Sequence, residues 1–465
     1  MPRGRISRRL FLGQTLASIV TLPARAAAPA LEGGFQILEA REGRLALLPG
    51  PAPTSAIWGY NGEVPGPVLR FKKGEEVKVR LVNELAQPTS LHWHGVRIVN
   101  SMDGVAGLTQ EPVPPGGTFA CRFTPPDSGL YWYHPHVRPF TGEQLDRGLY
   151  GAMIVEEAEP PVADSDIVAI LDDWKPGGDG GIAGFDLSAD GAGAGRTGPL
   201  ITVNAREAPA EHTLAPSARL RLRLVNAAHS RSMVIGFGGI APLVLAIDSQ
   251  PCEAFAPARN RIPLGPGARA DVMFDLPAEA GTNASVSLIG NDEPDRILLR
   301  FKTAGEKRSP LPPIAGLPEN PLLPARIRLE ASRRFDILIE ANAAGDPGPL
   351  TSLAQDQPLL WRLNGKALPA FAPEPLFAVK RGMPVTLGLI NRSGFVQEFH
   401  LHGHTMRILH DLDDGWEPYW RDTVLIAEGK TKHIAFVASN PGKWAIESVM
   451  AGRQAAGLAA WFQVT

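Results

Sequence analysis

Sulfur ligands are scarce in this sequence. Its 465 residues include only 2 Cys and 8 Met, whereas they include 11 His. Any metal chemistry must therefore rest mainly on imidazole and carboxylate groups. Long hydrophobic runs are lacking as well. The apolar run from Leu16 to Leu22 is far shorter than the ~20 residues of a membrane span, and no later run is longer, so we expect no membrane span.

An excess of basic residues is also absent once the first 28 residues are set aside. That segment holds five Arg and no acidic residue. The remainder has 41 basic and 48 acidic residues, a net charge of -7. This balance argues against nucleic acid or an anionic membrane surface as the main partner.

The amino terminus has the pattern of an export signal. Ser7-Arg8-Arg9-Leu10-Phe11-Leu12 matches the twin-arginine pattern, and a modest apolar run and small residues suited to cleavage follow it. A basic amphipathic first helix is the alternative interpretation. We expect residues 1–28 to be a twin-arginine signal peptide and the protein to be periplasmic. Because proteins with and without cofactors use this route, the signal alone does not imply a metal.

Short strands separated by turns are expected in the rest of the chain. The 49 Gly and 44 Pro fit many turns better than long helices. Segments such as 76–81 and 219–224 alternate apolar with other residues, which is typical of half-buried strands. The proline-rich stretches 156–161 and 309–324 are expected to be linkers.

The linkers divide the chain into three blocks, at 30–160, 162–303 and 325–465. Each block has the size of one Greek-key β-sandwich. A weak repeat supports this division, because one strand pattern that ends in an apolar residue followed by Asn occurs once in each block, at 77–83, 220–226 and 385–391. We predict an all-β fold of three sandwich domains.

Six of the histidines form three His-x-His pairs: His92 and His94, His134 and His136, His400 and His402. Residues i and i+2 of a strand face the same side, so each pair presents two imidazoles to one surface. Imidazole is the commonest ligand for copper and zinc among side chains. One such pair is more often a pair of ordinary surface or core histidines. Three pairs, two in the first block and one in the last, favour a metal site.

The residues around these pairs resemble the first three copper motifs of the multicopper oxidases, a laccase-like family of three cupredoxin domains. The matching segments are Leu-His-Trp-His-Gly at 91–95, Tyr-Trp-Tyr-His-Pro-His at 131–136 with Gly-Leu-Tyr-Gly at 148–151, and His-Leu-His-Gly-His at 400–404. Segments 264–271 and 421–424 resemble the family too. The resemblance implies three cupredoxin-like Greek-key domains and copper as cofactor.

The fourth copper motif of the family is altered here. In the family it reads His-Cys-His, with another His five residues after the Cys and an axial Met ten residues after it. The aligned positions of this chain hold, in order, Glu447, Ser448, Val449, Arg453 and Leu458. The remaining type 1 copper ligand, three residues before the third motif, is replaced by Gln397.

These replacements remove the ligands on which a type 1 copper depends, a thiolate and two imidazoles. Arg453 also brings a permanent charge toward the cation position, and two like charges 4 Å apart repel by about 4 kcal/mol at an effective dielectric constant near 20. Neither cysteine compensates for the loss. Cys121 is expected in a strand core and Cys252 lies in the middle block, and a disulfide between them stays open as an alternative. We predict no type 1 copper.

The other cluster keeps most of its ligands. By resemblance, His92 and His400 match the type 2 ligands, and four of the six type 3 ligands are matched by His94, His134, His136 and His402. Glu447 could add a carboxylate beside two of these imidazoles, which gives a plausible shell for copper, zinc or iron. An ion pair between Glu447 and Arg453 is about as plausible.

Asp103 stands where related enzymes keep an acid that supplies protons to oxygen. Since it precedes Gly104, a turn explains it equally well. His404 is expected either to orient a cluster ligand or to be a packed core histidine.

Two functions are consistent with these residues. One is a periplasmic metal-binding protein or modified oxidase, with copper in the residual six-His cluster and a small-molecule reductant as partner, but without ordinary laccase activity. The other is a metal-free scaffold that binds an envelope protein, for which a copper-free, twin-arginine-exported relative that serves cell division is a precedent. The two differ in whether the six rings converge around a space for metal or are plugged by side chains such as Arg453 and Met450.

Overall fold

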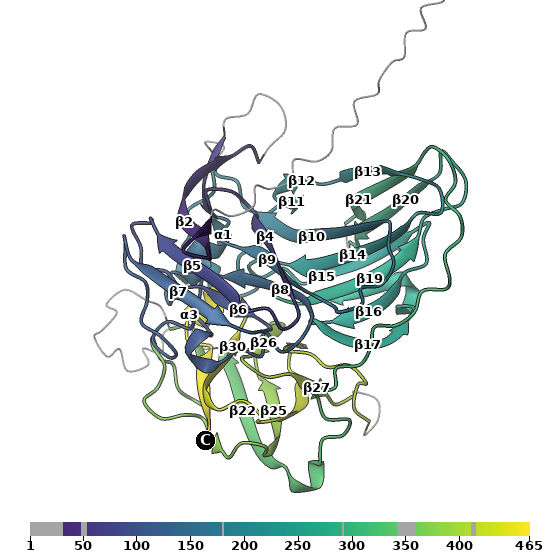
Figure 1. The fold of residues 1–465 in the computed structure, drawn as a ribbon. Coiled ribbons are helices and arrows are strands. Elements are labelled where there is room, and N and C mark those ends of the chain that lie inside the picture. The colour runs from purple at the N-terminus through teal and green to yellow at the C-terminus, as the bar shows by residue number, and fades with distance from the viewer. Residues whose placement is uncertain (1–30, 48–53, 179–180, 291–292, 342–358, 411–414) are drawn as a thin grey trace, which may run out of the picture.

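The computed structural model describes residues 31–47, 54–178, 181–290, 293–341, 359–410 and 415–465. The predicted signal peptide at 1–28 lies outside them. Strands dominate the described residues, as the all-β prediction requires, and the strands form six sheets (Figure 1). No helix among these residues has the length and apolarity needed to cross a membrane.

The first two sheets are built from residues 31–156. One contains β1 (Leu31–Glu32), β2 (Phe35–Leu45), β3 (Ser55–Tyr60), β5 (Val77–Asn83) and β7 (Thr118–Phe123). The other contains β4 (Gly66–Lys72), β6 (His92–His94), β8 (Gly129–His134) and β9 (Gly151–Glu156) in the order β4-β9-β8-β6. Strand β5 shows the expected alternation, with Val77, Val79 and Leu81 fully buried and the residues between them half-buried.

The middle two sheets are built from residues 165–303. One contains β10 (Ser165–Trp174), β11 (Leu200–Val203), β12 (Arg206–Glu207), β14 (Arg219–Asn226), β16 (Leu243–Ile247), β17 (Gln250–Phe255) and β19 (Arg269–Asp275). The other contains β13 (Ala210–Leu214), β15 (Met233–Gly238), β18 (Arg261–Leu264), β20 (Asn283–Leu288) and β21 (Arg296–Thr303).

Strand β14 differs from the half-buried strand that its sequence predicts. All of its residues are buried, including Arg219, Arg221 and Arg223. The arginines tolerate burial because carboxylates pair with them; Arg221, for example, donates to Asp271 Oδ2 at 2.6 Å and to Glu157 Oε1 at 2.6 Å. The predicted alternation of side chains along β14 is correct, but its arginine face packs against other residues of the protein instead of facing water.

The last two sheets are built from residues 333–464. One contains β22 (Arg333–Ala341), β23 (Trp361–Leu363), β25 (Pro384–Asn391), β27 (Met406–Ile408) and β29 (Thr431–Val437). The other contains β24 (Ala378–Val379), β26 (Gln397–Leu401), β28 (Thr423–Ile426), β30 (Gly442–Ser448) and β31 (Ala459–Val464). The short helices are α1 (Thr141–Asp146), α2 (Leu187–Asp190), α3 (Ala451–Ala455), η1 (Asn100–Met102), η2 (Ala258–Asn260) and η3 (Leu329–Ala331).

The repeated strand takes the same place in each pair of sheets. Strands β5, β14 and β25 each have one parallel neighbour and one antiparallel neighbour. Their terminal residues Asn83, Asn226 and Asn391 are buried. Each side-chain amide donates to a main-chain carbonyl four or five residues later and to one in a more distant segment, while its oxygen accepts the N–H two residues later. In each copy of the repeat, the Asn side chain therefore stabilises the turn that follows the strand.

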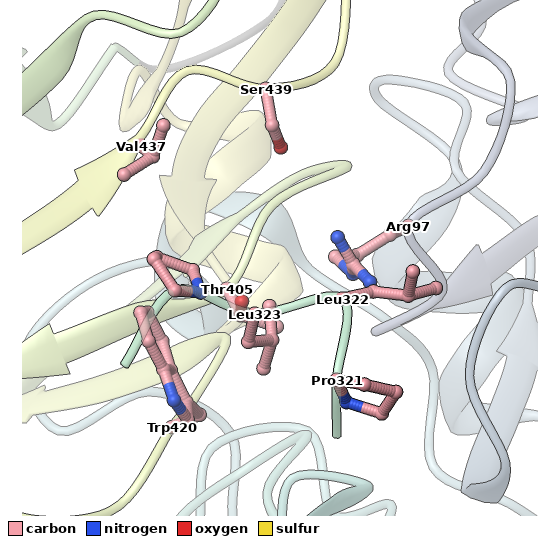
Figure 2. Close-up of a pocket in the computed structure, with 9 residues that line it drawn as sticks. Arg97, Pro321, Leu322, Leu323, Thr405, Trp420, Val437 and Ser439 are labelled. Atoms are coloured by element: carbon pink, nitrogen blue, oxygen red, sulfur yellow. The ribbon is translucent and has the colours of Figure 1, made fainter. Parts of the chain in front are cut away.

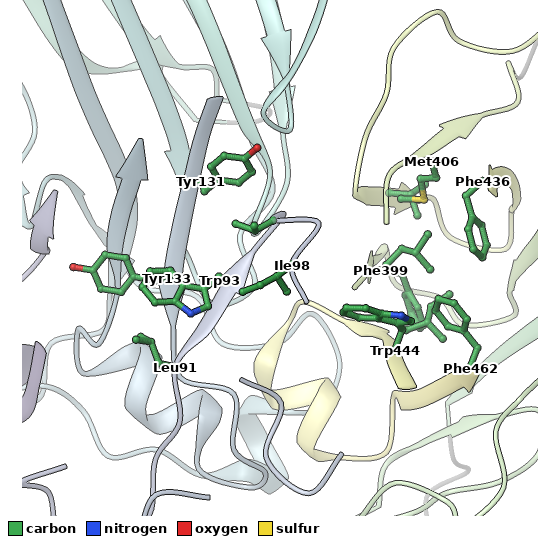
Figure 3. Packing of buried hydrophobic residues seen from close by; sticks show 14 of the residues in the cluster. Leu91, Trp93, Ile98, Tyr131, Tyr133, Phe399, Met406, Phe436, Trp444 and Phe462 are labelled. Carbon is green, nitrogen blue, oxygen red and sulfur yellow. The ribbon is translucent and has the colours of Figure 1, made fainter. Parts of the chain in front are cut away.

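A single hydrophobic core joins the first and third pairs of sheets. In Figure 3, Trp93 and Tyr133 of the first pair and Phe399 and Trp444 of the third lie on either side of Ile98. The middle sheets have a separate core. Figure 1 shows β6, β8, β26 and β30 near the centre of the molecule, and these strands carry most of the predicted ligands.

Candidate metal centre

The six histidines of the three motifs converge. Strands β6 and β8 pair so that His92 lies opposite His134. On β26, His400 lies opposite Glu447 of β30. All six imidazoles are buried, and together with Glu447 they line a cavity of about 20 Å³. A space of this size holds about one water molecule or a bare ion. Neither Arg453 nor Met450 lines it.

His92 and His400 present their Nε2 atoms in the same way. Nδ1 of His92 donates to the carbonyl oxygen of Asp103 at 2.7 Å, and Nδ1 of His400 donates to that of Asp422 at 2.9 Å. These bonds leave Nε2 of each ring as the unprotonated nitrogen. Both Nε2 atoms are buried and have no hydrogen-bond partner. A buried lone pair without a partner is costly unless something binds it.

A glycine brings the Asp103 carbonyl to the ring of His92. Gly104 adopts a φ of +80°, and a Cβ there would lie 1.9 Å from the carbonyl oxygen of Leu91, the residue before His92. Only glycine allows this close approach of two backbones. The turn interpretation of Asp-Gly is therefore confirmed, and the role of Asp103 as a proton donor stays a prediction.

His94 and His134 lie next to each other in the cluster. His94 Nε2 lies 3.2 Å from Thr423 Oγ1, and its ring stacks on His400 at 3.8 Å between centroids. Nδ1 of His134 donates to the Pro135 carbonyl at 2.9 Å, while its Nε2 lies 3.5 Å from His94 Nδ1. Ligand atoms of His92, His94 and His134 all lie within 4.8 Å of one another.

Glu447 contacts two imidazoles. Its Oε1 contacts His136 Nε2 and lies 3.2 Å from His402 Nε2, and the ligand atoms of the three residues lie within 4.8 Å of one another. Gln454 Nε2 donates to the same oxygen at 2.8 Å. The alternative expectation, an ion pair with Arg453, is wrong because the Arg453 guanidinium donates instead to Gln397 and to the carbonyls of Val396 and Gly193.

Asp103 holds His402 from the other side, with Oδ2 3.0 Å from His402 Nδ1. His402 thus lies between two carboxylates. Burial alone would lower its pKa, but the charges of Asp103 and Glu447 and their hydrogen bonds outweigh burial and raise the pKa to about 9. Burial would likewise raise the pKa of Asp103, but His402 and His92 hold it far below its usual range.

Four of the cluster imidazoles, those of His92, His94, His134 and His400, stay neutral at pH 7. Burial, together with the charge of His402, lowers the pKa of His92 to about 4. Burial is also the largest cause of the lowered pKa of His94, His134 and His400. A metal ligand must be deprotonated, so these rings are prepared for metal binding.

Asp422 and Arg269 support the cluster from behind. Arg269 reaches from the middle sheets and binds both oxygens of Asp422, at 2.8 and 2.5 Å, and both side chains are almost completely buried. Since the carbonyl of Asp422 orients His400, this ion pair couples the middle sheets to the cluster. Our sequence prediction missed both residues and Gln454; the segments 264–271 and 421–424 were its only signal for the pair.

His404 is a packed histidine next to the cluster. Its Nδ1 donates to the His402 carbonyl at 3.0 Å and its Nε2 accepts the Asn440 N–H at 3.3 Å. Both nitrogens are therefore used within the protein. Aromatic rings of Phe436 and Trp444 surround it.

The residues aligned with type 1 ligands are buried too. Arg453 Nη1 donates to Gln397 Oε1 at 2.9 Å, and its other hydrogen bonds go to the carbonyl oxygens of Val396 and Gly193. In the described part of the chain no carboxylate pairs with it, and burial lowers its pKa to about 10. The Ser448 N–H donates to the Leu458 carbonyl at 2.9 Å.

Both cysteines are free and lie elsewhere. Cys121 is in β7, and Cys252 is in β17, where its Sγ lies 3.9 Å from the Val244 carbonyl oxygen. The disulfide that the sequence left open is not formed.

A larger cavity of about 290 Å³ lies outside the imidazole cluster (Figure 2). It is lined by Arg97, Thr405, Trp420, Val437, Ser439 and residues 321–324 of the proline-rich linker. None of the predicted metal ligands takes part in it.

Comparison with known proteins shows which family the chain belongs to. A family model described as multicopper oxidase matches residues 45–160, and a second of the same description matches residues 345–465. The chain belongs to the multicopper oxidase family. Multicopper oxidase MmcO of Mycobacterium tuberculosis is 30% identical to it, over 98% of this chain and 96% of that protein.

A solved multicopper oxidase has the same fold. The crystal structure of the enzyme from Pseudomonas thermotolerans superposes with a TM-score of 0.81 at 30% identity, covering 92% of this chain and 98% of that one. Copper resistance protein A of Pseudomonas syringae pv. tomato is 43% identical over 116 residues, which are 24% of this chain and 18% of that protein. The family implies copper, and the histidine groups of this multicopper oxidase could hold metal.

Proposed function

We propose that this protein is a periplasmic copper-binding member of the multicopper oxidase family that holds copper in its six-imidazole cluster and lacks a type 1 copper. Predicted ligands are His92, His94, His134, His136, His400 and His402, with Glu447 as a carboxylate ligand. The proposal is one of copper binding and not of catalysis. The residues aligned with the type 1 copper ligands, which would receive electrons from a substrate, differ from those of the family.

The unpaired Nε2 atoms of His92 and His400 carry this proposal. Both are buried, both face the cavity, and main-chain carbonyls hold both rings in the tautomer that binds metal. Carbonyl-oriented imidazoles are the usual arrangement around a bound metal. Bound copper would supply one-electron redox chemistry to this cavity.

The lack of a type 1 copper is supported by the environment of Arg453. A fixed cation and the amide of Gln397 are bonded to each other where the family has copper ligands. Cys121 and Cys252 lie in other strands, so neither supplies a thiolate there. We therefore expect no appreciable oxidation of phenols with oxygen as acceptor.

Copper analysis of the purified protein tests the proposal. After copper loading and removal of loosely bound ions, the wild-type protein should retain copper, and His92→Ala/His400→Ala should retain much less. His433→Ala, which removes an exposed histidine of β29, is the matched control and should behave as the wild type. No retained copper, or retention unaffected by the double change, would contradict the proposal and favour the metal-free scaffold.

The periplasmic part is tested separately. The twin-arginine pattern at 7–12 supports it. Replacing Arg8 and Arg9 with Lys should leave the precursor in the cytoplasmic fraction, whereas the unchanged precursor should reach the periplasm. If the variant and the unchanged precursor were distributed equally between the cytoplasmic and periplasmic fractions, this result would contradict export by the twin-arginine route.

A further inference from the structure

Glu447 divides the imidazole cluster into two chemically different parts. Its Oε1 contacts the cavity-facing nitrogens of His136 and His402, whereas the corresponding nitrogens of His92 and His400 contact no hydrogen-bonding group. We propose that His136, His402 and Glu447 form a separate site for a divalent cation of the zinc or ferrous class, beside a cuprous site on His92 and His400. The inference rests on the proposed function, since it assigns different ions to parts of the same cluster.

The three ligands are close enough to share one ion. Their donor atoms lie within 4.8 Å of one another. A zinc-type ion about 2.0–2.2 Å from each donor would take the place of the Gln454 amide, whose Nε2 lies 2.9 Å from His136 Nε2 and 2.8 Å from Glu447 Oε1. Glu447 Oε2 is buried and has no hydrogen-bond partner, so it offers a second donor to the same ion. Two imidazoles and one carboxylate are a ligand set typical of divalent zinc and iron.

Charge favours a different ion on each side. Glu447 brings a negative charge that offsets part of the charge of a divalent ion. His92 and His400 are neutral ligands, so the charge of an ion held by them is offset only by the carboxylates of Asp103 and Asp422, which lie behind the rings and do not touch the ion. Because the cost of burying an ion rises with the square of its charge, two neutral imidazoles suit a monovalent cuprous ion better than a divalent one.

The ligands on the two sides are also oriented differently. His402 is bonded through Nδ1 to the carboxylate of Asp103 at 3.0 Å, and Gln454 fixes Glu447 at 2.8 Å. A carboxylate behind a ligating imidazole makes that imidazole more basic and strengthens its bond to a divalent ion. His92 and His400 instead donate from Nδ1 to main-chain carbonyls at 2.7 and 2.9 Å, and the nearest carboxylate oxygens, those of Asp103 and Asp422, lie farther away at 3.4 Å.

Titration of the metal-free, full-length mature protein with Co²⁺ and with Cu⁺ tests the division, since Co²⁺ reports its ligands by visible absorption. Glu447→Gln should weaken Co²⁺ binding by at least about tenfold and change Cu⁺ affinity by less than about twofold. His92→Ala/His400→Ala should weaken Cu⁺ binding by at least about tenfold and change Co²⁺ affinity by less than about twofold. Glu428→Gln, which changes an exposed glutamate in the turn between β28 and β29, should alter neither affinity.

A measurement on the unmodified protein makes the test independent of variant folding. Zn²⁺ should abolish the Co²⁺ spectrum, and Cu⁺ loading should leave it unchanged. Displacement of Co²⁺ by one equivalent of Cu⁺, equal weakening of both ions by Glu447→Gln, or Cu⁺ binding without Co²⁺ binding would each overturn the division while leaving copper binding intact. A wild-type protein that binds neither ion overturns the proposed function as well.

Discussion

Arg453 donates a hydrogen bond from Nη1 to the side-chain oxygen of Gln397, 2.9 Å away, in the interior of the third pair of sheets. The guanidinium also lies 5.0 Å from the ring of Trp361 and bonds the Gly193 carbonyl of the middle part of the chain. Two residues that the sequence aligns with copper ligands of the family thus bind each other here. They belong to a packed, hydrogen-bonded structure, so we expect both to contribute to stability.

Replacing this arginine should destabilise the protein. Arg453→Ala leaves the carbonyls of Val396 and Gly193 and the amide oxygen of Gln397 without a donor and removes packing from Trp361, which costs about 2–4 kcal/mol. The midpoint of thermal unfolding should fall clearly below that of the wild type. Arg392→Ala, at an exposed position of the same part of the chain, is the control. An unchanged midpoint for Arg453→Ala would show that the guanidinium is not a structural group.

Asp103→Asn should weaken metal binding at pH 9, where the proton on His402 competes least, without removing a ligand. The change takes away the charge behind His402 but keeps a side chain of nearly equal shape beside it. Loss of such a supporting group typically lowers metal affinity about 10–100-fold. Equilibrium titration with Zn²⁺ measures the effect, with the exposed Asp336→Asn as the control. Equal Zn²⁺ affinity of Asp103→Asn and Asp336→Asn would show that Asp103 does not support metal binding.

Binding of a divalent ion should strengthen as the pH rises toward 9. In the metal-free protein His402, between Asp103 and Glu447, has a raised pKa of about 9 and carries a proton at pH 7. A metal ion on Nε2 must displace that proton, so apparent affinity should rise about tenfold per pH unit between pH 7 and 9 and then level off. In Asp103→Asn the pKa of His402 is lower, and the plateau should begin at lower pH. A pH-independent affinity would contradict the protonated state of His402.

The ion pair of Arg269 and Asp422 should matter for both folding and copper. Arg269→Met leaves a buried carboxylate without its partner, which costs about 3–5 kcal/mol. Because Asp422 orients His400, copper retention should fall as well. Arg269→Met/Asp422→Asn, which removes both charges, should recover part of the thermal stability. If the double variant is less stable than Arg269→Met, the pair is not coupled as we describe.

Local sequence patterns predicted the parts of the site that depend on strand periodicity. The His-x-His pairs brought six rings together, although only His92, His94, His134 and His400 lie within strands and His136 and His402 follow them. The repeat ending in Asn83, Asn226 and Asn391 took equivalent places in the three pairs of sheets. The three domain boundaries stay predictions, and the signal peptide lies outside the described residues.

Tertiary contacts explain what the patterns could not predict. Glu447 and Arg453 are close in sequence, which suggested an ion pair, but β30 directs Glu447 to the histidines while α3 carries Arg453 to Gln397. The partnership of Arg269 with Asp422 joins residues 153 positions apart, and the burial of β14 depends on distant carboxylates. No local period contains such information.

The absorption spectrum of the copper-loaded, air-oxidised protein tests the central claim most directly. With copper retention verified on the same sample, the account predicts only the weak visible bands of imidazole-bound cupric ion. An intense blue thiolate-to-copper band, typical of a type 1 site, would contradict it.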